Sequence, residues 1–203
     1  FGDGAGNKFL YGRLLCAVLA VLMQQQQDAP GLAVFGKANT VPIEDWWPPS
    51  TRRDHLEHLV LHLEKRTADG PNDHLHGLDD LVDECHRRSL AAFVTDALVD
   101  PGELKDVLSR LGMRRTRVIL FHLLAREELE PKIDGEVVVV DQETGAERPV
   151  DGATYRRLYA ENLARVCSEV EKVCHDTETE YCLLPTDQPL DEALRRFLLL
   201  RSG

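Results

Sequence analysis

The sequence predicts an α/β fold: a doubly wound, mostly parallel sheet with helices on both faces and an added β-hairpin. Helical and strand-like segments alternate along most of the chain, which is the order expected of α/β proteins. The expected strands, such as 90–95 and 117–124, are unbroken apolar runs, as in parallel strands that are buried on both faces. Further along, Thr144-Gly145 separates two β-prone runs and predicts the turn of the hairpin.

The N-terminal half of the chain begins with an amphipathic helix. Its apolar residues recur at helical spacing: Leu10, Leu14, Leu15, Val18 and Leu22. A turn at 28–31 follows, and Ser50 or Thr51 is the expected cap of the next helix. The predicted elements of this half are a helix over 8–27, a strand over 32–35 with a candidate hairpin partner over 41–43, and helices over 51–66 and 72–88.

The C-terminal half continues the alternation and ends in a loop and a short helix. Its predicted elements are a strand over 90–95, a helix over 101–111, a strand over 117–124, a hairpin over 136–150, a helix over 152–175, a strand over 180–184 and a helix over 189–200. Pro189 suits the first turn of that last helix. No internal repeat and no Gly/Ser linker divides the chain, so we expect a single domain over 1–203.

The composition excludes several classes of protein. Hydrophobic residues make up 43% and charged residues 29% of the 203 residues, which is typical of a globular domain. The formal net charge of −11 argues against broad binding to nucleic acid or anionic membranes. The most apolar stretch, 14–23, is too short to span a bilayer. Five cysteines without a Cys-x-x-Cys pair predict reduced thiols in a cytoplasmic protein.

Two side-chain groups admit both a structural and a functional interpretation. His55, His58 and His62 share one side of a predicted helix and could bind zinc, but an apolar stripe beside them favours a polar flank. Trp46 and Trp47 precede two prolines. They either cover a neighbouring helix or form an exposed anchor for a partner.

Six sequence blocks, taken in order, carry a resemblance to a known family. They are the helix 8–22 leading through DAPGLAVFG (28–36), GPNDHLHGLDDL (70–81), AAFVTDALVD (91–100), VILFHLL (118–124), VVVVDQETGAE (137–147) and YCLLPTDQPLDEALRRFLLLR (181–201). The chain resembles the bacterial von Willebrand factor A-like family catalogued as domain of unknown function fifty-eight. Genes of that family often lie beside those of MoxR-type AAA+ ATPases. The resemblance implies a Rossmann-like, von Willebrand A-like sheet.

The resemblance also implies a metal site. In the wider class Mg²⁺ or Ca²⁺ lies at the carboxyl ends of the strands, held by an Asp-x-Ser-x-Ser motif, a Thr and an Asp. The Asp position maps to Asp96, and the Thr position falls on Asn72, beside Asp73. No Asp-x-Ser-x-Ser occurs in the chain. Either the first, central strand lies upstream of Phe1, which we favour, or this member has lost the site. Asp100 and Asp3 are candidate supporting acids.

We therefore expect a non-enzymatic protein-interaction module that docks a protein partner, with an AAA+ ATPase as the partner class that the resemblance implies. Its divalent-cation site is expected to be degenerate, with Mg²⁺ or Ca²⁺ as the cofactor or none. One alternative is a metal-dependent hydrolase in which Asp96 helps to hold a metal that activates water, although the sequence offers no matching base or nucleophile. The other is an assembly domain without metal. A membrane tether upstream of Phe1 stays open.

Overall fold

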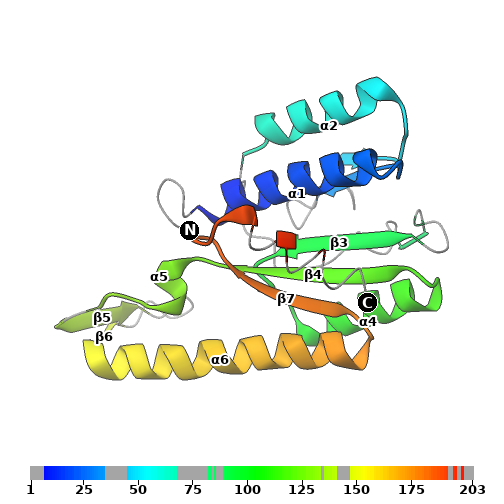
Figure 1. Cartoon of the computed structure of the whole chain (residues 1–203). Coiled ribbons are helices and arrows are strands. Elements are labelled where there is room, and N and C mark those ends of the chain that lie inside the picture. The colour runs from blue at the N-terminus through cyan, green and yellow to red at the C-terminus, as the bar shows by residue number, and fades with distance from the viewer. Residues whose placement is uncertain are drawn as a thin grey trace.

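A three-stranded parallel sheet forms the centre of the chain (Figure 1). The computed structural model describes residues 7–34, 45–67, 82–83, 85, 89–133, 135–140, 147–191, 194–195 and 198. The strands are β3 (Leu90–Thr95), β4 (Arg117–Leu124) and β7 (Glu180–Pro185), in the order β3-β4-β7. Both pairings are parallel, with Leu90 opposite Arg117 and Ile119 opposite Glu180. An α/β fold is thus confirmed, and its parallel strands end at one common edge.

The central strand β4 is the most buried element of the sheet. Every residue from Val118 to Leu124 is buried, because helices cover both faces. On one face Ile119, Phe121 and Leu123 share an apolar cluster with α1 (Lys8–Gln25). On the other face Val118 and Leu120 share a cluster with α4 (Pro101–Met113) and α6 (Gly152–Asp176). The prediction of helices on both faces is confirmed.

The helix α2 (Arg53–Lys65) forms an outer layer on α1 (Figure 1). Leu59 and Leu63 of α2 are buried against Ala20 of α1. The N-cap of α2 is Arg52, which makes no side-chain cap, so the predicted cap at Ser50 or Thr51 is wrong. The Ser50 hydroxyl instead accepts a hydrogen bond from the Arg52 N–H, at 3.2 Å, because the helix begins later than the cap prediction assumed, at Arg53.

A small antiparallel hairpin precedes α2. The strand β1 (Leu32–Val34) pairs with β2 (Asp45–Trp47), whereas the partner predicted at 41–43 lies outside the described residues. Trp46 packs against the cluster beneath α4, and the ring of Trp47 lies 5.3 Å from that of His62 on α2. Both indoles are partly buried, so the covering role weighed for this pair holds in the structure.

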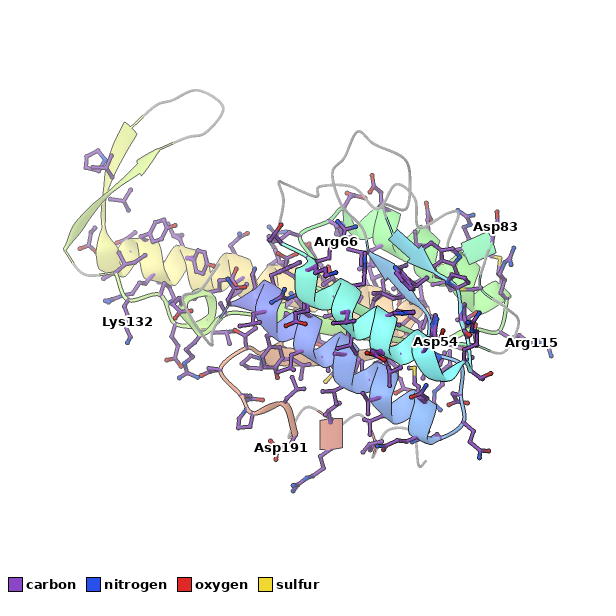
Figure 2. The ribbon with its side chains drawn as sticks, turned by 90° about the horizontal axis from the view of Figure 1, so that it is seen from above. Asp54, Arg66, Asp83, Arg115, Lys132 and Asp191 are labelled. Carbon is purple, nitrogen blue, oxygen red and sulfur yellow. The ribbon has the colours of Figure 1, made fainter. Side chains whose placement is uncertain are left out.

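A second hairpin follows the short helix α5 (Arg126–Leu129). Its strands are β5 (Glu136–Val140) and β6 (Glu147–Asp151), which pair antiparallel as predicted. Figure 2 shows this hairpin standing away from the three-stranded sheet at the N-terminal end of α6. Of the helix predicted over 72–88, only residues 82, 83 and 85 are described. Among the described helices none combines the length and the apolar character needed to cross a membrane.

Candidate functional site at the carboxyl edge of the sheet

Three charged side chains from distant parts of the chain meet at the carboxyl edge of the sheet. Lys8 is the first residue of α1, Asp96 follows β3, and Glu128 belongs to α5, which follows β4. Because β3 and β4 are parallel, their carboxyl ends lie side by side, and α1 begins over the same edge. We call Lys8, Asp96 and Glu128 the Lys8 cluster.

The ammonium of Lys8 joins both carboxylates. Its Nζ lies 2.8 Å from Oε1 of Glu128 and 3.2 Å from Oδ2 of Asp96. The side chains of Lys8 and Glu128 are 12% and 11% exposed, whereas that of Asp96 is 41% exposed. The cluster therefore has a sequestered pair inside and one carboxylate that reaches solvent.

Glu128 is held in place from a second side. Its Oε2 accepts a hydrogen bond from the backbone N–H of Ala125, at 2.7 Å, so both carboxylate oxygens have a donor. Burial lowers the pKa of Lys8, but the hydrogen bond to Glu128 and the negative charges of Asp96 and Glu128 outweigh it, and the net shift is upward. The ammonium is thus charged at neutral pH.

The turn after β3 orients Asp96. Ala97 has a φ of 54°, in the left-handed region that non-glycine residues rarely adopt, and its side chain is 2% exposed. Its backbone N–H donates a hydrogen bond to Oγ1 of Thr95, at 3.0 Å. This hydrogen bond closes a tight turn directly after the strand, and Asp96 stands between the two residues that make it.

A buried histidine lies beneath this turn. His122 of β4 is 1% exposed, and its Nδ1 lies 2.9 Å from the phenol oxygen of Tyr181 on β7. Burial lowers the pKa of His122, opposed by a hydrogen bond to the backbone of Asp96 and by the charge of Asp96. Burial also raises the pKa of Tyr181. At neutral pH the pair is uncharged. The imidazole is closed to solvent although Tyr181 is only partly buried, and a closed imidazole does not suit a general base for an external substrate.

Burial limits the reactivity of three of the five thiols. None of the five cysteines forms a disulfide in the structure. Burial raises the pKa of Cys16 and of Cys174 to about 11 and also raises that of Cys167. Since the thiolate is the reactive form, these three are poor nucleophiles at neutral pH.

Of the three predicted metal ligands, Asp96 is the one that the described part of the chain places at this site. Asn72, Asp73 and Asp3 lie outside that part, so their roles stay predictions. Asp100 caps α4 instead, because its Oδ1 accepts hydrogen bonds from the N–H groups of Gly102 and Glu103. In the described part of the chain, no group of three or more His, Cys, Asp or Glu side chains could hold a metal ion. The described contacts of Asp96 fit an ammonium better than Mg²⁺ or Ca²⁺.

The histidines of α2 likewise form a polar flank. The Nε2 of His55 lies 2.9 Å from the carbonyl oxygen of Pro30, and the rings of His55 and His62 face Trp47. The zinc interpretation of this row therefore receives no support from the described geometry. Sequence reasoning missed Lys8 and Glu128, which are 120 positions apart. The available signal was weak: an acidic pair in the four residues after a buried strand, at the edge where Asp96 was expected.

The family described as Protein of unknown function DUF58 matches residues 1–168. No curated protein matches the chain. No solved structure matches it either.

Proposed function

Because the chain belongs to the DUF58 family, whose description assigns no activity, we propose from the site itself that it is a non-enzymatic protein-interaction module of the von Willebrand A-like class. The observation that carries this proposal is the anchoring of Asp96. Its carboxylate is 41% exposed, yet it is paired with an ammonium that is almost fully sequestered. A charge held in one position before binding loses little freedom when a partner docks, which favours recognition.

The chemistry of the described groups supports binding over catalysis. An enzyme of the hydrolase type needs a base or nucleophile that its substrate can reach. In the described ranges, His122 is enclosed beside Tyr181, and Cys16 and Cys174 are protonated at neutral pH. No observation favours the metal-dependent hydrolase, and it stands as the alternative that the binding experiment below must exclude.

The partner class comes from the resemblance to von Willebrand A-like proteins encoded beside MoxR-type AAA+ ATPases. We propose such an ATPase as the partner, docked at the carboxyl edge of the sheet. Ion pairs continue along this edge from the Lys8 cluster: Arg126 of α5 lies 2.7 Å from Glu130 and 3.9 Å from Asp187, which follows β7. A charged rim of this kind steers association and makes the rate of binding sensitive to salt.

The test is a binding titration of the chain against the MoxR-type AAA+ ATPase encoded in the same genome, by biolayer interferometry. We expect Asp96→Asn to weaken binding at least about tenfold, which corresponds to about 1.4 kcal/mol. The matched control is Asp106→Asn, which changes an exposed carboxylate on α4 and should bind like the unaltered chain.

Three results would contradict the proposal. The first two are equal binding by the Asp96→Asn and Asp106→Asn variants, and no binding by the unaltered chain. The third is Mg²⁺-dependent hydrolysis of phosphate-ester, carboxylic-ester or peptide substrates that the Asp96→Asn variant loses, because this would identify the hydrolase instead.

A further inference from the structure

The Lys8 cluster has the charge arrangement of a small cation site whose cation is already part of the chain. Two carboxylates, from Asp96 and Glu128, converge on one ammonium at the carboxyl edge of parallel strands. A site for Mg²⁺ in a protein often uses one or two carboxylates in this way, with water completing the shell. Here the position between the carboxylates is filled by Nζ of Lys8, so a divalent ion at that position would meet a fixed positive charge.

We infer that Lys8 is the resident cation of this edge, and that the edge keeps Asp96 in its binding geometry without a divalent metal. Three features of the described chain support this role. The Lys8 side chain is 12% exposed, so its charge is withdrawn from solvent rather than displayed. Glu128 is equally sequestered and has its second oxygen bound to the N–H of Ala125. Only Asp96 is left to face a partner, with one oxygen on the ammonium.

The position of Lys8 in α1 explains how the ammonium is held there. Asn7 caps the helix, its side chain accepting a hydrogen bond from the N–H of Leu10, and Lys8 is the first helical residue. Four residues along, Gly12 lets the helix lie close to the sheet, since a Cβ there would be 3.2 Å from Cδ1 of Leu123. The cap and this close approach place the start of α1 over the ends of β3 and β4, within reach of both carboxylates.

The electrostatic consequence is specific. Without the ammonium, two carboxylates would share a partly buried site with no counter-charge, which is costly in a medium of low polarity. A Lys8→Met variant should therefore unfold at a lower temperature, by more than about 3 °C for a chain of this size. Mg²⁺ or Ca²⁺ should recover part of that loss, because the vacated position then offers two carboxylates and room for water. The matched control is Lys132→Met; Lys132 is exposed and projects from the loop after α5 (Figure 2).

The experiment measures thermal unfolding and isothermal titration with MgCl₂ and CaCl₂, without any partner, so it can fail independently of the proposed function. We expect the unaltered chain and Lys132→Met to show no saturable heat and the same midpoint in EDTA and in 10 mM metal. Lys8→Met should show a lower midpoint that the metals raise, and Lys8→Arg should retain most of the original midpoint.

Three outcomes would overturn the inference. The first is saturable Mg²⁺ or Ca²⁺ binding by the unaltered chain that Asp96→Asn abolishes, because Asp96 would then be a metal ligand in the presence of Lys8. The second is a Lys8→Met midpoint equal to that of Lys132→Met. The third applies if Lys8→Met does not fold. Lys8→Arg keeps the positive charge, so if Lys8→Arg is unfolded as well, the positive charge is not what the site requires.

Discussion

The Nδ1 atom of His122 lies 2.9 Å from the phenol oxygen of Tyr181, across the neighbouring strands β4 and β7. The ring centroids are 6.0 Å apart, and His122 is 1% exposed. On its other side His122 interacts with the backbone of Asp96, directly below the Lys8 cluster. This buried polar pair therefore connects the interior of the sheet to the turn that presents the exposed carboxylate.

Removing the phenol oxygen should destabilise the fold. A Tyr181→Phe variant leaves a buried imidazole nitrogen without its partner, and we expect a loss of about 1–3 kcal/mol in the free energy of unfolding. Urea denaturation followed by circular dichroism measures this loss. Tyr155→Phe, on α6, is the control and should change stability by less than about 0.5 kcal/mol. Equal losses in the two variants would show that the His122–Tyr181 contact contributes nothing.

The chain should become less stable at pH values below the ordinary pKa of histidine, because His122 is buried in its neutral form. Its pKa is lowered in the folded state, so above pH 6.5 the favourable neutral state is fully present. As the pH falls through 6.5 and then through the lower folded-state pKa, the unfolded chain takes up a proton first and stability is lost. The charged or titratable groups nearby are Asp96, Lys8, Glu128 and Tyr181.

The measurement is the free energy of unfolding between pH 7.5 and pH 5, in the unaltered chain and in His122→Gln. The amide side chain can keep one hydrogen bond but does not titrate. We expect the slope of stability against pH to be smaller in His122→Gln. Parallel curves would mean that other histidines or carboxylates govern the acid side of the profile.

Arg13 ties α1 to the end of α2. Its Nη1 donates to the carbonyl oxygens of Arg66, Glu64 and Leu63, at 2.8, 2.9 and 3.3 Å, at the end of α2, where helix carbonyls lack the regular intrahelical N–H donor. Arg66 marks this end of α2 in Figure 2. Arg13→Met keeps the aliphatic stem but removes the donors, and it should cost about 1.5–3 kcal/mol of stability.

Hydrogen exchange should localise the effect of Arg13→Met. The amides of α2 should lose protection before those of β4, because α2 packs on α1, which in turn packs on the sheet. Arg157→Met, which breaks an exposed i,i+4 ion pair with Glu161, is the control and should leave protection unchanged. A uniform loss of protection across both elements would count against a local tie.

The left-handed residue after Asp96 should reject branched side chains. At a φ of 54°, Ala97→Val should destabilise the chain by more than about 2 kcal/mol, through strain and crowding together. Ala97→Gly tolerates this φ and should stay within about 1 kcal/mol of the unaltered chain. Ala125→Val, at an equally buried alanine of φ −73°, separates crowding from strain. An Ala125→Val loss as large as that of Ala97→Val would remove the role of backbone strain.

The regular elements could be predicted because their signals are local. The apolar runs at 90–95 and 117–124, the period of the first helix and the β-prone runs of the second hairpin each depend on neighbours within about ten positions, whereas the predicted turn at Thr144-Gly145 lies outside the described residues. The cap of α2 was missed because residue type alone favours Ser50 or Thr51, whereas the helix begins at Arg53 and the Ser50 hydroxyl accepts from the N–H of Arg52 outside it. Asp96 could be placed at an edge of the sheet, since it directly follows an apolar strand; that strand is partly buried rather than buried on both faces as expected, because it is an outer strand of the described sheet.

The sequence by itself determined the α/β class, the parallel character of the strands and the position of Asp96 at the end of one of them. Only the tertiary structure decided what surrounds Asp96. The separations of 88 and 120 positions between Lys8 and its two carboxylates leave no trace in any local pattern. They meet because parallel strands end at one edge and because α1 packs on one face of the sheet with its first residue at that edge. The physical reason is that hydrophobic periodicity encodes which face of an element is buried, whereas the pairing of charges depends on which faces come together.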